Sequence, residues 1–70
     1  MDAIADNKLK QFREERMLSK AELARKAGIS PLTVDRVENG ESCRLSTMRK
    51  ILLALDMELA ERHQIFPQLA

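Results

Sequence analysis

The chain has 70 residues, of which 44% are hydrophobic and 33% charged, and its net charge is +1. This length predicts one domain near the lower limit for independent folding. The nearly balanced charge differs from that of a strongly basic nucleic-acid binder, so any site for a polyanion must be local. The single cysteine, Cys43, excludes an internal disulfide, and the lone His63 has no Cys/His cluster beside it that would predict a metal site.

The composition of the chain favours helices over strands. Aromatic residues make up 3%, and there are two glycines and two prolines, so the core is expected to be aliphatic. The longest apolar run is too short to span a bilayer, and no basic-then-apolar signal peptide opens the chain. We therefore expect an all-α, soluble, cytoplasmic protein that has no membrane contact.

The apolar pattern predicts five short helices separated by turns. The first is expected from about Asp6 to Arg16. The second opens on "SKAE", where Ser19 is the expected N-cap and Glu22 completes a capping box. Gly28 is the expected left-handed C-cap of this second helix.

The third helix has a start signal and a stop signal. Ser30 is its expected N-cap, and Pro31 stands at the first helical position, where its missing N–H costs nothing. The helix is expected to end at Asn39-Gly40. Because only a tight turn fits between the second and third helices, the two must cross steeply as a helix-turn-helix over about residues 19–39.

The boundary between the fourth and fifth helices is open. The fourth is expected to start at Ser46, and the fifth to cover residues 58–64. No glycine or proline separates them, so Asp56 would have to adopt the left-handed conformation of the turn. One continuous helix over residues 46–64 is the alternative.

The third helix has a mixed outer face. At about 100° per residue, Val34 and Val37 define its inner side. The opposite side carries Leu32, Asp35, Arg36 and Asn39. In a DNA major groove, arginine can bond guanine O6 and N7, aspartate can accept from cytosine N4, and leucine can meet a thymine methyl. The alternative, a solvated face with one stray leucine, is disfavoured by the capped turn before it.

The run from Lys8 to Phe66 resembles the Cro/cI-type (XRE-type) helix-turn-helix family of phage and bacterial repressors. The most specific parts are "LSKAELARKAGIS" and the "VENG" that closes the third helix. The resemblance implies a lambda-repressor-like compact bundle of five short helices, with residues 1–70 as one domain with short tails. It also implies a homodimer that binds double-stranded operator DNA with the third helix in the major groove.

The resemblance further implies three sets of functional residues. Base-reading positions fall on Pro31, Leu32, Thr33 and Arg36, to which the helical wheel adds Asp35. Positions at the DNA backbone fall on Ser19, Lys20, Asn39, Gly40, Ser42 and Arg44, and Ser30 is grouped with them. A buried ion pair falls on Arg13 and Glu38, which the wheel also places near the core. We interpret this pair as structural first, with alignment of the arginine on a phosphate as a second role.

The sequence departs from the family pattern at several positions. Pro31 and Leu32 carry no side-chain donor, so hydrogen-bonded readout is expected to depend mainly on Arg36, or on DNA shape. Met17 and Asp56 stand where the family commonly has glycines after the first and fourth helices. Asp56 is expected to tolerate the left-handed conformation of such a turn less well than glycine.

The C-terminal segment "AERHQIFPQLA" has two interpretations. Its apolar residues Ile65, Phe66 and Leu69, together with Met57, either complete the core or form a two-fold dimer interface. An interface would place the two recognition helices about 34 Å apart, on successive major grooves.

The leading functional hypothesis is a sequence-specific DNA-binding transcriptional regulator that represses from a two-fold operator. The alternative is an antitoxin-like or other interaction module that binds a co-encoded partner protein. The chain contains no Ser/His/Asp set, nucleotide-binding loop or metal-ligand cluster. Neither enzymatic activity nor a metal or other cofactor is therefore expected.

Overall fold

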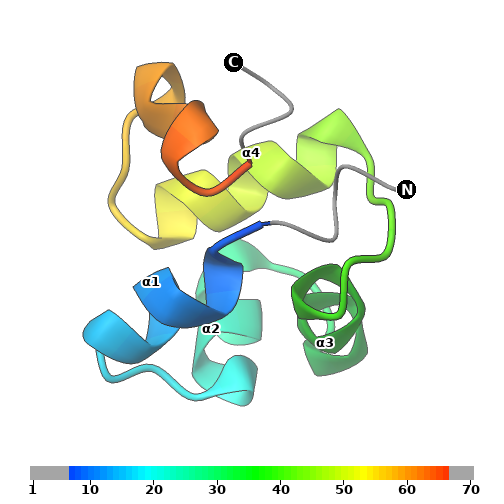
Figure 1. Cartoon of the computed structure of the whole chain (residues 1–70). Helices are drawn as coiled ribbons and strands as arrows, with labels where there is room; N and C mark the ends of the chain where they lie inside the picture. The colour runs from blue at the N-terminus through cyan, green and yellow to red at the C-terminus, as the bar shows by residue number, and fades with distance from the viewer. Residues whose placement is uncertain (1–6, 67–70) are drawn as a thin grey trace.

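Four α-helices and a final 3₁₀ helix make up the computed structural model, which describes residues 7–66. The elements are α1 (Leu9–Glu15), α2 (Lys20–Ala27), α3 (Pro31–Glu38), α4 (Leu45–Ala54) and η2 (Leu59–Gln64). In Figure 1, α1, α2 and α3 form the lower part of the bundle, and α4 and η2 lie across the top. The predicted all-α fold of five short helices is confirmed. Within the described residues, none of the helices combines the length and apolar character needed to cross a bilayer.

The predicted caps of α2 and α3 are present. Ser19 Oγ accepts from the Glu22 backbone N–H at 3.0 Å, and the Glu22 carboxylate accepts from the Ser19 N–H at 2.8 Å. That backbone hydrogen bond lowers the pKa of Glu22. Gly28 has a φ of 71°, as expected for a left-handed C-cap, and Ser30 Oγ accepts from Thr33 N at 3.1 Å. Local capping chemistry therefore fixes both ends of the turn between these helices.

All four α-helices end in the same hydrogen-bonded turn. The left-handed residues are Met17, Gly28, Gly40 and Asp56, with φ of 56°, 71°, 90° and 59°. The residue after each donates to a carbonyl five positions earlier, from Leu18 to Arg13, Ile29 to Ala24, Glu41 to Arg36, and Met57 to Leu52. This is the Schellman pattern, and glycine suits its left-handed position best. Two of the four turns therefore hold a residue whose Cβ disfavours that conformation.

Replacing Met17 with glycine is expected to raise the free energy of unfolding by about 0.5–1 kcal/mol, and Asp56→Gly should act similarly. Met17 is 89% exposed, so its side chain contributes almost no packing that the change would remove. The same change in a helix interior, Lys50→Gly, should instead lower stability by about 1 kcal/mol. Urea unfolding of the three variants checks this, and destabilisation by Met17→Gly would contradict the expected strain.

The first helix begins later than the predicted Asp6, which lies outside the described residues. Asn7 Oδ1 accepts from Leu9 N at 3.0 Å, so the asparagine acts before the first turn and not within it. The Lys8 N–H donates to Ile65 O at 2.9 Å and joins the start of α1 to the C-terminal segment. Asn7 and Lys8 therefore make their contacts outside the helix, which begins at Leu9.

The structure also decides the limits of the fourth and fifth helices. The alternative of one helix over residues 46–64 is wrong, because the chain turns at Asp56 and a new capping box opens η2. This last helix is 3₁₀ in type. The fourth helix starts at Leu45 and not at Ser46, since Arg44 has the extended backbone of an N-cap, with φ −73° and ψ 154°.

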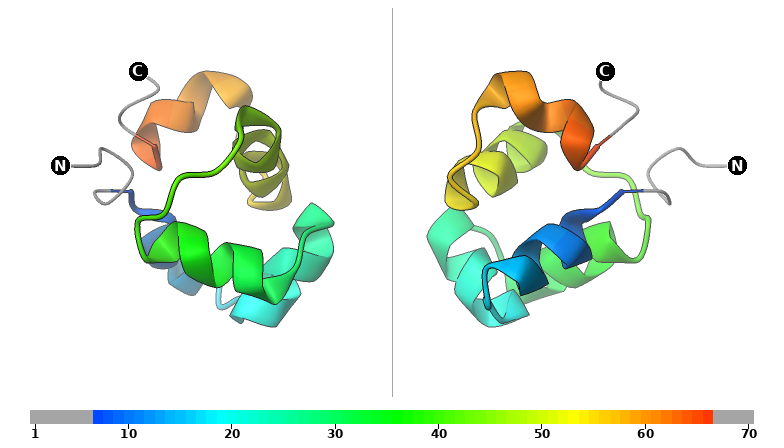
Figure 2. Two further views of the ribbon diagram at one scale, coloured as in Figure 1. Left: turned by 90° about the vertical axis from the view of Figure 1, so that its right-hand side faces the viewer. Right: turned by 60° about the vertical axis from the view of Figure 1, so that its left-hand side comes forward.

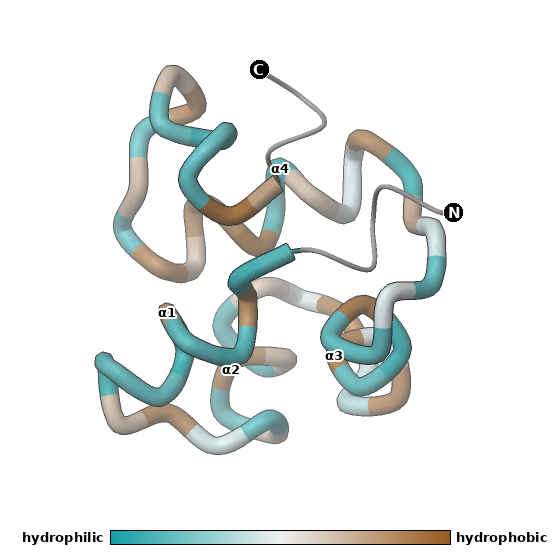
Figure 3. The backbone as a smooth tube through the Cα atoms, viewed as in Figure 1, coloured by the Kyte–Doolittle hydropathy of each residue, from teal (hydrophilic) through white to brown (hydrophobic). Residues whose placement is uncertain are grey.

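The core is aliphatic apart from one phenylalanine. Hydrophobic and hydrophilic residues alternate along the helices in Figure 3, as expected where one side of each helix is buried. Met57 is 5% exposed, and Ile65 and Phe66 are fully buried. These three side chains complete the core, which supports the first of the two interpretations of the C-terminal segment, because a buried side chain offers no surface to a second copy. Leu69 lies outside the described residues.

Candidate nucleic-acid interface

The third helix lies on the outside of the bundle. In the left view of Figure 2, α3 runs across the front, with α2 at one end and the loop to α4 at the other. Val34 and Val37, on its inner side, are 0% and 1% exposed, whereas Leu32 on the outer side is 56% exposed. The predicted division of α3 into a buried and an exposed face is confirmed.

Two contacts, one from α1 and one from Asn7 just before it, hold the C-terminal end of α3. Arg13 Nε lies 2.6 Å from Glu38 Oε2, and Arg13 Nη2 donates to Oε1 at 3.3 Å. The third guanidinium nitrogen donates to Leu18 O at 2.8 Å. The second contact, which the sequence did not predict, is a 2.7 Å hydrogen bond from Asn7 Nδ2 to Val37 O. These contacts fix α3, and with it the exposed outer face of the helix, relative to α1.

The Arg13–Glu38 pair is buried, with side-chain exposures of 9% and 4%. The hydrogen bond from Arg13 to Glu38 raises the pKa of Arg13 and so favours the charged guanidinium. Every nitrogen of this guanidinium already donates within the chain. This geometry favours the structural role over direct alignment on a phosphate.

The first turn of α3 presents few unengaged polar groups. Pro31 and Leu32 are exposed and apolar. Thr33 is half-buried, and its hydroxyl lies 2.9 Å from Ser30 Oγ, which also caps the helix. The hydroxyls of Ser30 and Thr33 therefore bond each other before any ligand arrives.

Arg36 is the outward cation of α3. It is exposed, and no residue within the described range 7–66 forms a hydrogen bond or ion pair with its guanidinium. A guanidinium with five donors and no internal acceptor can reach a planar, two-acceptor partner such as a guanine edge. Of the side chains predicted to read bases, Arg36 is the best equipped to donate.

Asp35, one of the predicted base-contacting residues, is already engaged with two side chains of the protein. Its Oδ1 lies 2.5 Å from Lys20 Nζ, and its Oδ2 accepts from Asn39 Nδ2 at 3.3 Å. The hydrogen bond to Asp35 raises the pKa of Lys20. The sequence carried a signal for the contact with Asn39, which is four residues away on the same helix. The contact with Lys20 joins two helices and could be found only in the tertiary structure.

The loop after α3 contains the remaining predicted backbone-contacting residues. The Gly40 N–H donates to Val37 O at 3.0 Å and the Glu41 N–H to Arg36 O at 3.0 Å, so both end the helix. These two N–H groups are therefore engaged within the chain, and contact of Gly40 with the DNA backbone stays a prediction. The side chains of Ser42 and Arg44 are exposed beside them.

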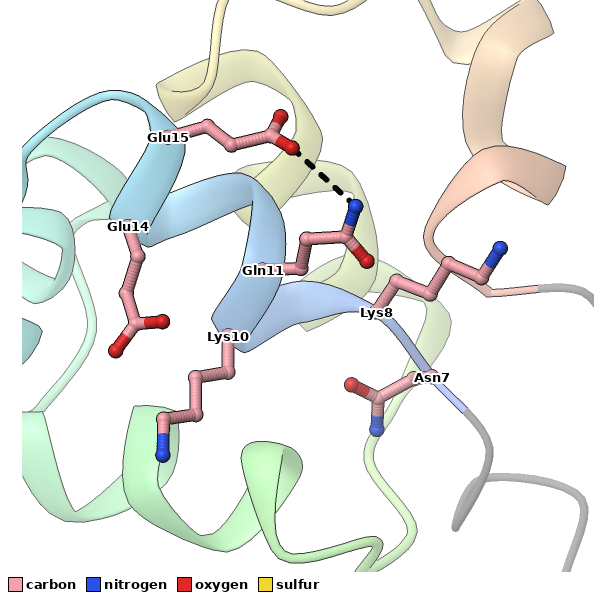
Figure 4. A pocket seen from close by; sticks show the side chains of 6 residues that line it. All are labelled: Asn7, Lys8, Lys10, Gln11, Glu14 and Glu15. Atoms are coloured by element: carbon pink, nitrogen blue, oxygen red, sulfur yellow. Dashed lines mark hydrogen bonds between the residues drawn. The ribbon is translucent and has the colours of Figure 1, made fainter.

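Features outside α3 are less suited to a polyanion. A recess of about 550 Å³ lies along α1 (Figure 4). Its lining residues are Asn7, Lys8, Lys10, Gln11, Glu14 and Glu15. The two lysines and two glutamates balance in charge, and Gln11 donates to Glu15 at 3.2 Å. Neither the cysteine nor a metal site adds a reactive centre among residues 7–66. Burial raises the pKa of the Cys43 thiol, which makes the thiol less reactive. These residues contain no group of three or more potential metal ligands.

These features define a helix-turn-helix domain. Two capped helices, α2 and α3, are joined by a left-handed glycine. The second helix has an exposed face, and contacts from Arg13 and Asn7 hold its C-terminal end. Residues 9–62 match the HTH_3 helix-turn-helix family model, and the chain belongs to this family. The family match confirms the XRE-type resemblance found in the sequence.

Two solved structures are similar to the chain. An HTH_3 family transcriptional regulator from Vibrio cholerae is 32% identical, with a TM-score of 0.77 over 97% of this chain and 38% of that one. A hypothetical transcription factor, NHTF, from Neisseria is 29% identical, with a TM-score of 0.72 over 97% of this chain and 75% of that one. This chain thus spans well under half of the Vibrio cholerae chain. A comparison with curated proteins gave no match.

Proposed function

We propose that this chain is a sequence-specific transcriptional regulator that binds double-stranded DNA with α3 in the major groove. The observation that carries the proposal is the exposed Arg36, which has no hydrogen-bond or ion-pair partner among residues 7–66 and lies on a recognition helix whose opposite face is buried. An α-helix fits the major groove, where a guanidinium bonds guanine O6 and N7. The family match and the two similar transcription regulators support the same function.

As part of this proposal, the protein acts as a repressor and binds as a homodimer. One helix-turn-helix reads only a few base pairs, so a second copy on a two-fold site supplies the missing affinity and specificity. Sedimentation velocity with and without DNA tests the dimer. A single monomer bound per operator at high protein concentration would remove this part of the proposal.

Selection of bound duplexes from a random pool tests the main proposal. We expect a two-fold symmetric motif with a guanine in each half-site, because Arg36 occurs once in each copy. Its affinity should fall steeply as salt is raised, since phosphate contacts release counterions. Recovery of no motif from a folded protein would contradict sequence-specific DNA binding.

A groove between α4 and η2 favours a second candidate function, binding to a co-encoded partner protein. Its volume is about 270 Å³. It is lined by Leu45, Met48, Arg49, Leu52, Leu59 and Arg62. Leu45 and Leu59 are 68% and 43% exposed and lie in the same groove, and grouped apolar side chains of this kind are typical of interaction sites. Two arginines beside an apolar floor fit a partner segment that is both apolar and acidic.

The two functions differ in their response to salt and to mutation. DNA binding should weaken with salt and be reduced by Arg36→Ala. Association with a co-encoded protein through the apolar groove should depend little on salt and be reduced by Leu59→Glu. Binding of such a protein without any salt-dependent DNA binding would favour the interaction module.

A further inference from the structure

Asp35 places a carboxylate in the middle of the proposed DNA-binding face. It comes from α3, next to Arg36, and its side chain is 40% exposed. A negative charge on this surface opposes binding to phosphate at every sequence. A solvated helix face alone does not explain why an acidic residue occupies this position.

The Asp35 carboxylate binds two other polar side chains on the same face. One carboxylate oxygen binds the ammonium of Lys20, the first residue of α2, and the other accepts from the Asn39 amide. Both Lys20 and Asn39 were expected to contact the DNA backbone. One carboxylate thus engages two of the groups that would otherwise meet phosphate.

A contribution to stability alone does not account for the contacts that join Lys20, Asp35 and Asn39. The Lys20 and Asp35 side chains are 44% and 40% exposed, and solvent screens an exposed pair so that it adds little to stability. The buried Arg13–Glu38 pair and the Asn7 contact already fix α3. The effect of the Asp35 charge should therefore appear in binding.

The carboxylate also keeps acceptor capacity. Each oxygen has two lone-pair sites and uses one in the contacts described, so each can accept a further hydrogen bond. In the major groove, cytosine N4 and adenine N6 are donors, whereas guanine O6, N7 and thymine O4 are acceptors that would face the carboxylate unfavourably. Discrimination by repulsion of the wrong partner is a recognised source of specificity.

We propose that Asp35 is a specificity-determining residue that holds Lys20 away from phosphate and admits only a base that presents an exocyclic amino group in the major groove, which is cytosine or adenine. The inference rests on the proposed function and adds to it the chemistry of one further base. On random DNA the carboxylate remains paired with Lys20, and binding is weak. On the correct site, the amino group of cytosine or adenine, beside the guanine read by Arg36, compensates for the negative charge.

The test measures affinity for a random-sequence duplex at several salt concentrations. It compares the unchanged chain with Asp35→Asn, Lys20→Gln and the double variant. Asp35→Asn should bind random DNA roughly eightfold more tightly at 0.1 M salt, and its salt slope should steepen by about 0.9, the value for one additional phosphate contact. Lys20→Gln should weaken binding far more in the Asp35→Asn background than alone, because only there is the ammonium released.

Asp56→Asn is the matched control. It removes the same charge in the same isosteric way at the end of α4, which lies on the opposite side of the bundle from α3 in Figure 1. We expect less than a twofold change in its affinity for random DNA. Thermal unfolding should show that all variants remain folded, since no buried contact is lost.

Repeating the duplex selection with Asp35→Asn tests the base preference. Asparagine bonds adenine in bidentate fashion, so one position in each half-site should shift toward adenine. The inference is overturned if Asp35→Asn behaves like Asp56→Asn in salt slope and selects the same site as the unchanged chain. Should Arg36→Ala still weaken binding in that case, the proposed function stands and only the role of Asp35 falls. Absence of DNA binding by the unchanged chain would remove both.

Discussion

Replacing Glu38 with alanine is expected to lower the free energy of unfolding by about 3–5 kcal/mol. The carboxylate accepts two hydrogen bonds from Arg13, and the two side chains are only 4% and 9% exposed. Alanine would leave a buried guanidinium with two N–H groups that lack an acceptor. A loss of this size is a large share of the roughly 5–15 kcal/mol that stabilises a typical domain. Urea unfolding, followed by circular dichroism, measures it directly.

Three further variants test the cause of that loss. Glu38→Gln keeps one acceptor oxygen and should cost less, about 1–3 kcal/mol. Glu41→Ala makes the same truncation at an exposed position and should change stability by no more than about 0.5 kcal/mol. Replacing both Arg13 and Glu38 by methionine or leucine should cost less than removing the carboxylate alone, because no unpaired charge remains. Equal stability of Glu38→Ala and Glu41→Ala would show that the ion pair is not structural.

Replacing Arg36 with alanine is expected to weaken binding to the selected DNA site by about 1–3 kcal/mol, roughly five- to 150-fold. The guanidinium has no acceptor among the described residues, so the change should remove a DNA contact without disturbing the fold. The preference for guanine in each half-site should relax at the same time. Fluorescence anisotropy with the selected duplex and with a duplex substituted at that guanine measures both effects.

Two controls separate base reading from general charge. Arg36→Lys keeps the charge but lacks the bidentate fork, so it should retain most of the salt dependence and lose much of the guanine preference. Arg62→Ala removes the same charge from η2, where the guanidinium donates to Leu59 O at 3.0 Å, and should affect DNA binding only slightly. If Arg36→Ala and Arg62→Ala weaken binding equally and uniformly across sequences, Arg36 does not read a base.

The helix-turn-helix was predictable from sequence because its determinants are local. The contacts of Ser19 with Glu22, the left-handed Gly28 and the cap at Ser30 each involve residues within a few positions of one another. The division of α3 into a buried and an exposed face also follows from helical periodicity alone. The left-handed conformation of Asp56 was the one expected if the fourth and fifth helices were separate, and the structure shows that they are.

Several features of the site depend on residues far apart in the chain. Asn7 joins the start of α1 to the end of α3, and Lys20 meets Asp35 across the two helices of the motif. No periodicity or cap pattern encodes such contacts, because each depends on how two helices are placed relative to one another. The same holds for Ile65 and Phe66, which are as compatible with an interface as with a core until the packing is known.

The sequence by itself determined the helical class, the two capped helices of the motif and the outward arginine, because capping and periodicity act within one or two helical turns. Only the tertiary structure decided that the C-terminal apolar residues fill the core, and that the exposed apolar groove lies between α4 and η2. It also decided that Asp35 is paired with Lys20, since side chains 15 positions apart meet only after α2 and α3 have crossed.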